Sequence, residues 1–142
     1  MKANFKAFWV LPIVAVLTAS LLFASAAQYT SALPKLSVSV KVAKDPISRG
    51  NTQTVSVKVT SGGKGVGGAS VSSKVVYTSS LTKSFSGKTD SMGSWSFSWQ
   101  IGGNSNPGIF KVLVTASKSG FDSSTGSASF TVITKSGKSK KY

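Results

Sequence analysis

Apolar and polar residues alternate along most of the chain after position 35. In the first such run the apolar positions are Leu36, Val38, Val40 and Val42, with serine or lysine between them. Alternation with a period of two is typical of a β-strand with one buried face, whereas an amphipathic helix repeats every 3.6 residues. The pattern therefore predicts seven short strands, in residues 36–42, 55–60, 69–77, 81–85, 94–101, 110–116 and 128–132.

Turn-forming residues separate these runs, among them Asp45-Pro46, Gly62-Gly63 and Pro107-Gly108. Before residue 94, we expect Asp90 to accept a hydrogen bond from the backbone amide two residues on, and Gly93 to take the left-handed conformation that closes the turn. Short strands joined by turns, with no room for helices, are typical of antiparallel sheets packed face to face. The fold expected for residues 36–133 is thus an all-β, seven-stranded antiparallel β-sandwich.

The first 27 residues have the pattern of a secretory signal peptide. Two lysines in residues 1–6 precede an uncharged, mostly apolar run over residues 7–23, and the small residues 24–27 follow. This order matches the three regions of a signal peptide, with cleavage expected after Ala26 or Ala27. We predict a signal helix over residues 1–27, a linker over 28–35 and a basic flexible tail over 134–142.

An uncleaved membrane anchor is the alternative for this segment. A membrane-spanning helix needs about 20 apolar residues, whereas this run covers residues 7–23 and contains Pro12. In either case we expect the folded part to lie outside the cell or on its surface. The chain has no Cys, so an exported domain has no disulfide and depends on packing alone.

The composition argues against most catalytic chemistry. The chain has 17 Lys or Arg residues and three Asp, with no Glu, His or Cys. General acid–base catalysis usually uses His or a carboxylate pair, and soft-metal sites use Cys and His. Asp45, Asp90 and Asp122 are too scattered to predict a calcium site and fit turns better. We therefore expect no enzymatic activity, no metal and no cofactor.

Three phrases carry a resemblance to a known family. They are Gly-Val-Gly-Gly-Ala-Ser-Val at 65–71, Thr-Asp-Ser-Met-Gly-Ser-Trp-Ser-Phe at 89–97, and Pro-Gly-Ile-Phe-Lys-Val-Leu-Val-Thr-Ala at 107–116, followed by Gly120-Phe121. With these, residues 36–133 resemble the immunoglobulin-like (Ig-like) modules of prokaryotic surface proteins, including invasin-type and macroglobulin-type domains. The resemblance implies an Ig-like sandwich that acts as a spacer, an adhesive domain or a ligand-binding domain. One copy in this chain departs from the arrays that form long stalks.

An aromatic row on one strand has two interpretations. Trp95, Phe97 and Trp99 share one face of residues 94–101, and the other face carries serines and Gln100. Because one face of such a strand is buried, we predict that the aromatic face forms the core. The alternative is an exposed platform that stacks on sugar rings, as in carbohydrate-binding modules.

Lysines provide the candidate binding surface. The formal net charge of +14 attracts polyanions such as wall polymers, acidic glycans, anionic lipid or DNA, with strong salt dependence. Sequence-specific nucleic-acid recognition is not expected, because Arg49 is the one arginine in the sequence. Simple solubility is the plainer explanation of these charges. The candidate contacts are the outward strand lysines Lys41, Lys58, Lys74 and Lys111 and the tail lysines Lys135, Lys138, Lys140 and Lys141.

These observations together predict a secreted or cell-surface, non-enzymatic Ig-like module with a structural, adhesive or binding role. A carbohydrate-binding module and a nonspecific polyanion binder are the alternatives. The expected partners are anionic polymers or cell-surface proteins, and a membrane only if the signal segment stays attached.

Overall fold

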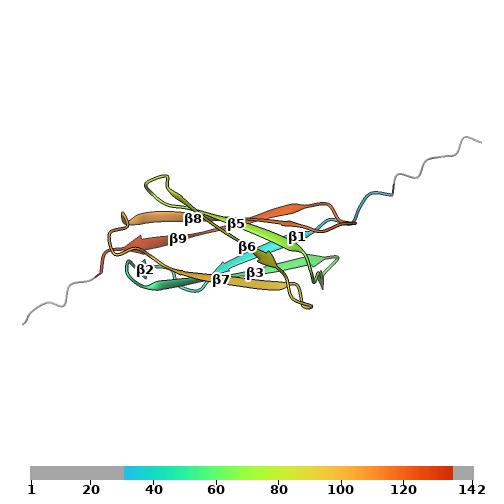
Figure 1. The fold of residues 1–142 in the computed structure, drawn as a ribbon, viewed down its shortest axis with the longest axis horizontal. Helices are drawn as coiled ribbons and strands as arrows, with labels where there is room; N and C mark the ends of the chain where they lie inside the picture. Colours follow the sequence, from blue (N-terminus) through green and yellow to red (C-terminus); the bar gives the residue numbers. More distant parts are fainter. Residues whose placement is uncertain (1–30, 136–142) are drawn as a thin grey trace, which may run out of the picture. The chain divides into compact units, whose positions relative to one another are not determined.

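The computed structural model describes residues 31–135, and this part of the chain is all-β, as predicted. It contains no helix, and therefore none long and apolar enough to span a membrane. The predicted signal segment, the start of the linker and the tail after Lys135 lie outside the described residues. Nine strands form two sheets (Figure 1): β1 (Ser37–Val42), β2 (Ile47–Ser48), β3 (Thr52–Ser61), β4 (Lys64–Gly65), β5 (Ser70–Val76), β6 (Thr82–Lys88), β7 (Ser94–Gln100), β8 (Gly108–Ser117) and β9 (Ser124–Ile133).

The first sheet is built around β3. Strands β1 and β3 are antiparallel, with Ser37 opposite Thr60 at one end of the pairing and Val42 opposite Val55 at the other. Strand β7 pairs antiparallel with β3 over residues 52–58, and the short β4 pairs with the last residues of β3. The inner positions of β3 carry Val and Gln, so this strand is buried on its inner face over most of its length.

The second sheet has the order β2-β9-β8-β5-β6. The pairs among β9, β8, β5 and β6 are antiparallel, but β2 runs parallel to β9, with Ile47 opposite Val132. The isolated bridge between Lys35 and Asp122 is also parallel, so the prediction of a purely antiparallel fold was wrong at these two positions. The chain reaches β2 through the Asp45-Pro46 turn, where the Asp45 carboxylate accepts a hydrogen bond from the Thr131 amide at 2.9 Å.

The structure also has nine strands where the alternation predicted seven. Both additional strands, β2 and β4, are two residues long, which is too short for any periodic signal. The segment before β4 forms a two-residue hairpin turn, in which Gly62 and Gly63 have φ of 56° and 80°. A hairpin turn of this type requires positive φ at both central residues, which glycine adopts without strain.

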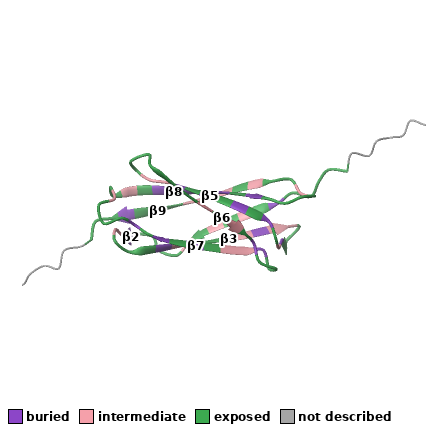
Figure 2. Ribbon diagram, in the orientation of Figure 1, coloured by how far each residue is buried: buried purple, intermediate pink, exposed green. Residues whose placement is uncertain are grey.

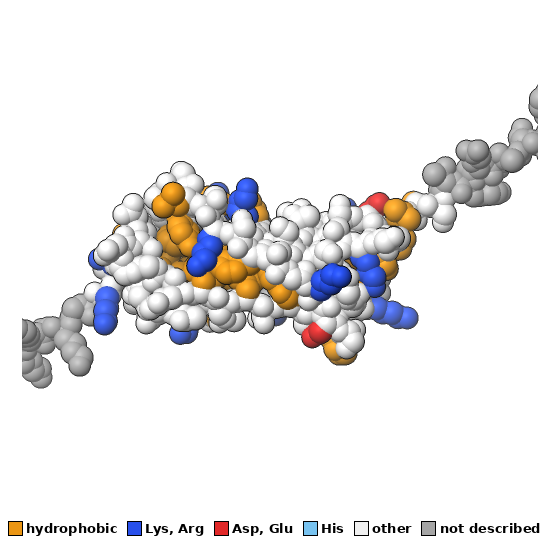
Figure 3. Space-filling view, viewed as in Figure 1, with side chains coloured by type: hydrophobic (Ala, Val, Ile, Leu, Met, Phe, Trp, Pro, Cys, Tyr) orange, Lys and Arg blue, Asp and Glu red, His pale blue; other side chains and the backbone are white. Residues whose placement is uncertain are grey.

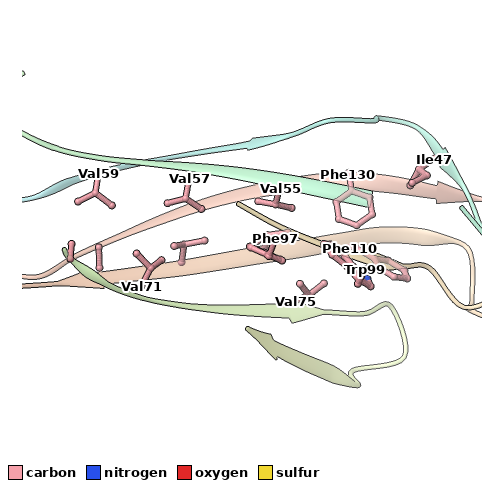
Figure 4. Close-up of a cluster of buried hydrophobic side chains, with 14 of the residues drawn as sticks. Ile47, Val55, Val57, Val59, Val71, Val75, Phe97, Trp99, Phe110 and Phe130 are labelled. Atoms are coloured by element: carbon pink, nitrogen blue, oxygen red, sulfur yellow. The ribbon is translucent and has the colours of Figure 1, made fainter. Parts of the chain in front are cut away.

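The inner faces of the two sheets share one hydrophobic core. Buried residues alternate with exposed ones along β3, β5 and β8, as the period-two pattern predicts (Figure 2). Val55 and Val57 of the first sheet and Val75 of the second are at most 2% exposed. Figure 4 shows side chains from strands of both sheets directed into this cluster, among them Val71, Phe97, Phe110 and Phe130.

Aromatic rings connect the two sheets across the core. The Phe97 ring of β7 stacks on Phe85 of β6 with centroids 4.4 Å apart, and Trp99 meets Phe130 of β9 edge-on at 6.0 Å. Such pairs stabilise a fold by about 0.5–1.5 kcal/mol beyond the area they bury. Burial raises the pKa of the Tyr77 hydroxyl, an effect that the nearby Trp99 indole N–H partly opposes. Among the described residues, Trp99 Nε1 completes no hydrogen bond of ordinary geometry.

Candidate anion-binding groove

The outer face of the first sheet is covered by hydroxyl and ammonium groups. On this face, Ser39 of β1 lies opposite Lys58 of β3, and Lys41 lies opposite Ser56. Strand β7 continues both rows, because Ser94 lies opposite Lys58 and Ser96 opposite Ser56. Lys41 and Lys58 therefore occupy diagonal positions on neighbouring strands, where long side chains are within reach of the same ligand.

A groove of about 770 Å³ lies over this face and continues to the connection between β6 and β7. Its lining contains three lysines and a single carboxylate, together with hydroxyl groups from five serine or threonine residues. This lining favours a ligand that carries negative charge and accepts several hydrogen bonds. The lining residues are Ser39, Lys41, Ser56, Val57, Lys58, Lys88, Thr89, Asp90, Ser94, Trp95 and Ser96.

The single carboxylate of the groove, Asp90, holds the turn between β6 and β7. Its Oδ1 accepts hydrogen bonds from the backbone amides of Met92 and Ser94, both at 2.9 Å, and Gly93 has φ of 78°. The predicted Asp90 bond and the predicted role of Gly93 are thus both confirmed. The hydrogen bond from the Ser94 amide is the main cause that lowers the pKa of Asp90; desolvation partly opposes it, and the Met92 amide and the Lys58 charge lower the pKa further. Asp90 is therefore ionised at neutral pH and its oxygen is used within the turn.

Lys58 connects the sheet to this turn. Its Nζ donates to the Met92 carbonyl oxygen at 2.6 Å and lies 3.4 Å from Ser94 Oγ. The side chain is half-buried, whereas Lys41 and Lys88 are exposed. Lys58 thus helps to shape the groove, and the ammonium groups of Lys41 and Lys88 are better placed to meet a ligand from solvent.

Thr89 has a structural role at the base of the same connection. The residue is buried, and its Oγ1 donates to the Val66 carbonyl at 2.6 Å and accepts from the Ala69 amide at 2.9 Å. These two bonds anchor the end of β6 to the segment that precedes β5. Since the hydroxyl is used in this way, the serines on the outer sheet face are the groups left to bind a ligand.

The aromatic row divides between the core and the groove. Trp99 is 5% exposed and Phe97 is 9% exposed, which confirms the core interpretation for both residues. Trp95 is different, because it is half-buried at the edge of the core and also lines the groove. Its ring lies beside Phe97, with centroids 4.9 Å apart. The row is therefore no continuous platform for sugars, although one indole lies at the groove margin.

The predicted contact lysines do not form one surface. Lys41 and Lys58 lie on the groove, whereas Lys74 on β5 and Lys111 on β8 are exposed on the outer face of the other sheet. Lys135 is exposed after β9, and Lys138, Lys140 and Lys141 lie outside the described residues. The structure adds Lys88, which alternation alone did not single out because it ends a strand with a weak apolar pattern.

The carboxylates in the described part of the chain are dispersed. Asp45 binds the Thr131 amide, Asp90 closes its turn, and Asp122 takes part in backbone hydrogen bonds with Pro34 and Leu36. Between residues 31 and 135, no three Asp, Glu, His or Cys side chains gather into a group that could hold a metal ion.

No family model matches the chain, and no curated protein matches it. Among solved structures, the alkylpurine DNA glycosylase AlkC of Pseudomonas fluorescens is similar with a TM-score of 0.49 and 17% identity, over 70% of this chain and 30% of the glycosylase. The soluble domain of PmoD from Methylocystis has a TM-score of 0.49 and 13% identity, over 72% of this chain and 98% of that domain. A β-glucosidase of Erythrobacter marinus scores 0.42 at 12% identity, over 70% of this chain and 16% of the enzyme.

Proposed function

We propose that this chain is an exported, non-enzymatic Ig-like β-sandwich that binds an anionic polymer, such as an acidic wall glycan, in the groove over the first sheet. The fold assignment is supported by two sheets that share one core and by seven long strands. The signal pattern of residues 1–27 supports export to the cell surface or the medium. The functional assignment depends on one observation, the convergence of Lys41, Lys58 and Lys88 on a hydroxyl-lined groove.

The groove chemistry favours a polymer with carboxylate or phosphate groups over a neutral sugar. Ammonium groups attract anions from solution and make charge-assisted hydrogen bonds to them. The serines of three neighbouring strands offer both donors and acceptors to sugar hydroxyls. A neutral carbohydrate-binding module with an aromatic platform is less well supported, since Phe97 and Trp99 are buried.

Two double variants with the same charge change test this proposal. Lys41→Gln with Lys88→Gln removes two charges from the groove, and Lys74→Gln with Lys111→Gln removes two from the other sheet. A lysine near an anionic surface contributes about 1 kcal/mol, so the groove variant should bind polygalacturonate about thirtyfold more weakly. Isothermal titration calorimetry at low salt measures the effect. Over a series of salt concentrations, the slope of log affinity against log salt should be less steep by about two for the groove variant than for the wild type.

The control variant distinguishes binding of the polymer in the groove from attraction by the overall positive charge of the protein. The other-face variant keeps the groove lysines, so it should lose only the small long-range part of the attraction. Equal losses in the two variants would show that net charge alone binds the polymer and that the groove has no special role. Circular dichroism of both variants confirms that the fold is intact.

A further inference from the structure

Strand β7 has an open edge in the described structure. It pairs with β3 on one side, and β6, the nearest strand of the other sheet, pairs with β5. Asp90 takes up the backbone N–H and C=O of Ser94. From residue 96 to 100, the outer edge of β7 therefore presents backbone N–H and C=O groups that no strand of the described residues takes up. Such a row is a template for the addition of another strand.

This edge lacks the features that usually prevent strand addition. Natural edge strands are short, bulged, covered, or marked by charged residues and proline. Strand β7 has seven residues, Ser-Trp-Ser-Phe-Ser-Trp-Gln, with no charge and no proline, and its pairing with β3 continues without a bulge. The other edges are protected: β2 and β4 have two residues each, β6 carries Lys83 and Lys88, and β1 is approached by β9 at Gly126.

Apolar side chains next to this edge are incompletely covered. Phe85 of β6 and Trp95 of β7 are half-buried, and both pack against the core from the side where β6 and β7 meet. On the face where β6 and β7 lie, Figure 3 shows hydrophobic side chains in a continuous stripe with lysine or arginine beside it. A strand added to β7 would place every second side chain beside Trp95 and Phe97 and over this stripe.

The charges beside the edge select an acidic occupant. Lys83 and Lys88 lie toward opposite ends of β6, and Lys83 Nζ lies 5.6 Å from the centroid of the Phe85 ring. Gly87 lies against Trp95, and Phe85 contacts both Phe97 and Trp99, so the two lysines lie near opposite ends of β7. Lys83 is on the same face of β6 as Phe85, whereas Lys88 is on the other face and lines the groove. A second copy of this chain is a poor occupant of this edge, because its net charge of +14 would repel these lysines.

We propose that the outer edge of β7 binds an extended acidic segment of a partner protein by β-strand addition. The added strand alternates apolar residues, which cover the stripe between β6 and β7, with Asp or Glu residues, which lie on its opposite face within reach of Lys88. Backbone hydrogen bonds to β7 provide affinity, and the alternation sets the register. This site shares Lys88 and Trp95 with the polymer groove, but it requires a peptide backbone and not only negative charge.

A peptide pair separates backbone pairing from charge attraction. The probe is a nine-residue peptide that alternates Val with Glu, and its control is the same peptide with N-methyl groups on alternate amides. Both carry the same charge and side chains, but the control cannot complete a ladder with β7. NMR of the purified protein measures affinity from amide shifts and measures hydrogen-exchange protection of β7 amides.

The proposal predicts that the unmodified peptide protects edge amides of residues 96–100 at least tenfold and binds at least tenfold more tightly than the N-methylated control. The variant Lys88→Gln should bind the unmodified peptide severalfold more weakly. Equal binding of both peptides, or protection confined to β6 or to the groove residues of β1 and β3, would overturn it. So would a peptide-free dimer whose β7 edge amides are already protected, because the occupant would then be a second copy.

Discussion

The indole of Trp95 on β7 lies directly against the backbone of Gly87 on β6. A Cβ atom added at Gly87 would collide with Nε1 and Cε2 of that ring, and the nearest groups are all from Trp95. Gly87 is therefore needed for close approach between strands of different sheets, and not for an unusual φ angle. This contact holds Trp95 at the margin of both the groove and the open β7 edge.

Replacing Gly87 by Ala should displace the Trp95 ring and destabilise the fold. Overpacking a filled site costs about 1–3 kcal/mol, and the displaced indole should become more exposed, with a red-shifted fluorescence maximum. The matched control is Gly103→Ala, because an added Cβ there meets nothing within 4 Å. Chemical denaturation measures both variants, and equal stability of the two would contradict the proposed contact.

Gln53 is a polar residue that is 0% exposed at the inner face of β3. Its Nε2 donates to the Lys44 carbonyl at 2.6 Å, and its Oε1 accepts from the amides of Lys44 at 3.1 Å and Thr54 at 3.2 Å. The side chain thus satisfies the backbone of the segment that leads from β1 to β2.

Replacing Gln53 by Leu keeps a similar volume but removes both the donor Nε2 and the acceptor Oε1. The partner backbone groups of Lys44 and Thr54 are only partly buried. Because a net hydrogen bond contributes about 0.5–1.5 kcal/mol, the free energy of unfolding should fall by about 1–3 kcal/mol. Thr54→Val on the exposed face of the same strand removes only the bond to Ser98, and should change stability by less than about 0.5 kcal/mol. A Gln53→Leu variant as stable as the control would contradict the assigned role.

Asp90 should make stability depend on pH below neutrality. Its folded-state pKa lies below the ordinary value of 3.8, chiefly through the hydrogen bond from the Ser94 amide. As pH falls, the unfolded chain therefore takes up a proton at Asp90 before the folded chain does. The stability that the ionised Asp90 contributes is lost as pH falls from 3.8 through the lower pKa of the folded state. Above pH 3.8, the contribution is fully present.

The variant Asp90→Asn isolates this effect. At neutral pH it should be less stable than the wild type, and the difference should shrink as pH falls through 3.8 and below. Urea denaturation at a series of pH values measures the difference. A difference that stays constant over this range would show that ionisation of Asp90 does not stabilise the turn.

Alternation located the seven long strands because apolar residues fill most of their inner positions, but it misjudged where several strands begin. Strand β3 begins at Thr52, three residues before Val55, since the buried Gln53 occupies an inner position with a polar side chain. Strand β9 begins at Ser124 because small residues replace apolar ones near β1, where Gly126 contacts the backbone of Val38. Such close approaches depend on which strands meet, and alternation within one strand does not record that.

The same reasoning explains what could be predicted of the site. Outward positions of Lys41, Lys58, Lys74 and Lys111 follow from alternation, and all four lie on outer faces of the sheets. Their division between two faces depends on strand pairing, which brings β1 beside β3 and places β5 beside β8 in the other sheet. Lys88 joins the groove because the β6–β7 connection crosses from one sheet to the other, a feature of the tertiary structure alone.

NMR titration of the purified protein with polygalacturonate tests the central claim most directly. If the groove binds the polymer, backbone amide shifts should change first and most at Lys41, Ser56, Lys88 and Ser96, with little change at Lys74 and Lys111. The changes should reverse when salt is raised toward about 1 M, where the Debye length falls to about 3 Å. Shift changes of equal size on both outer faces, or changes that persist at high salt, would contradict the account.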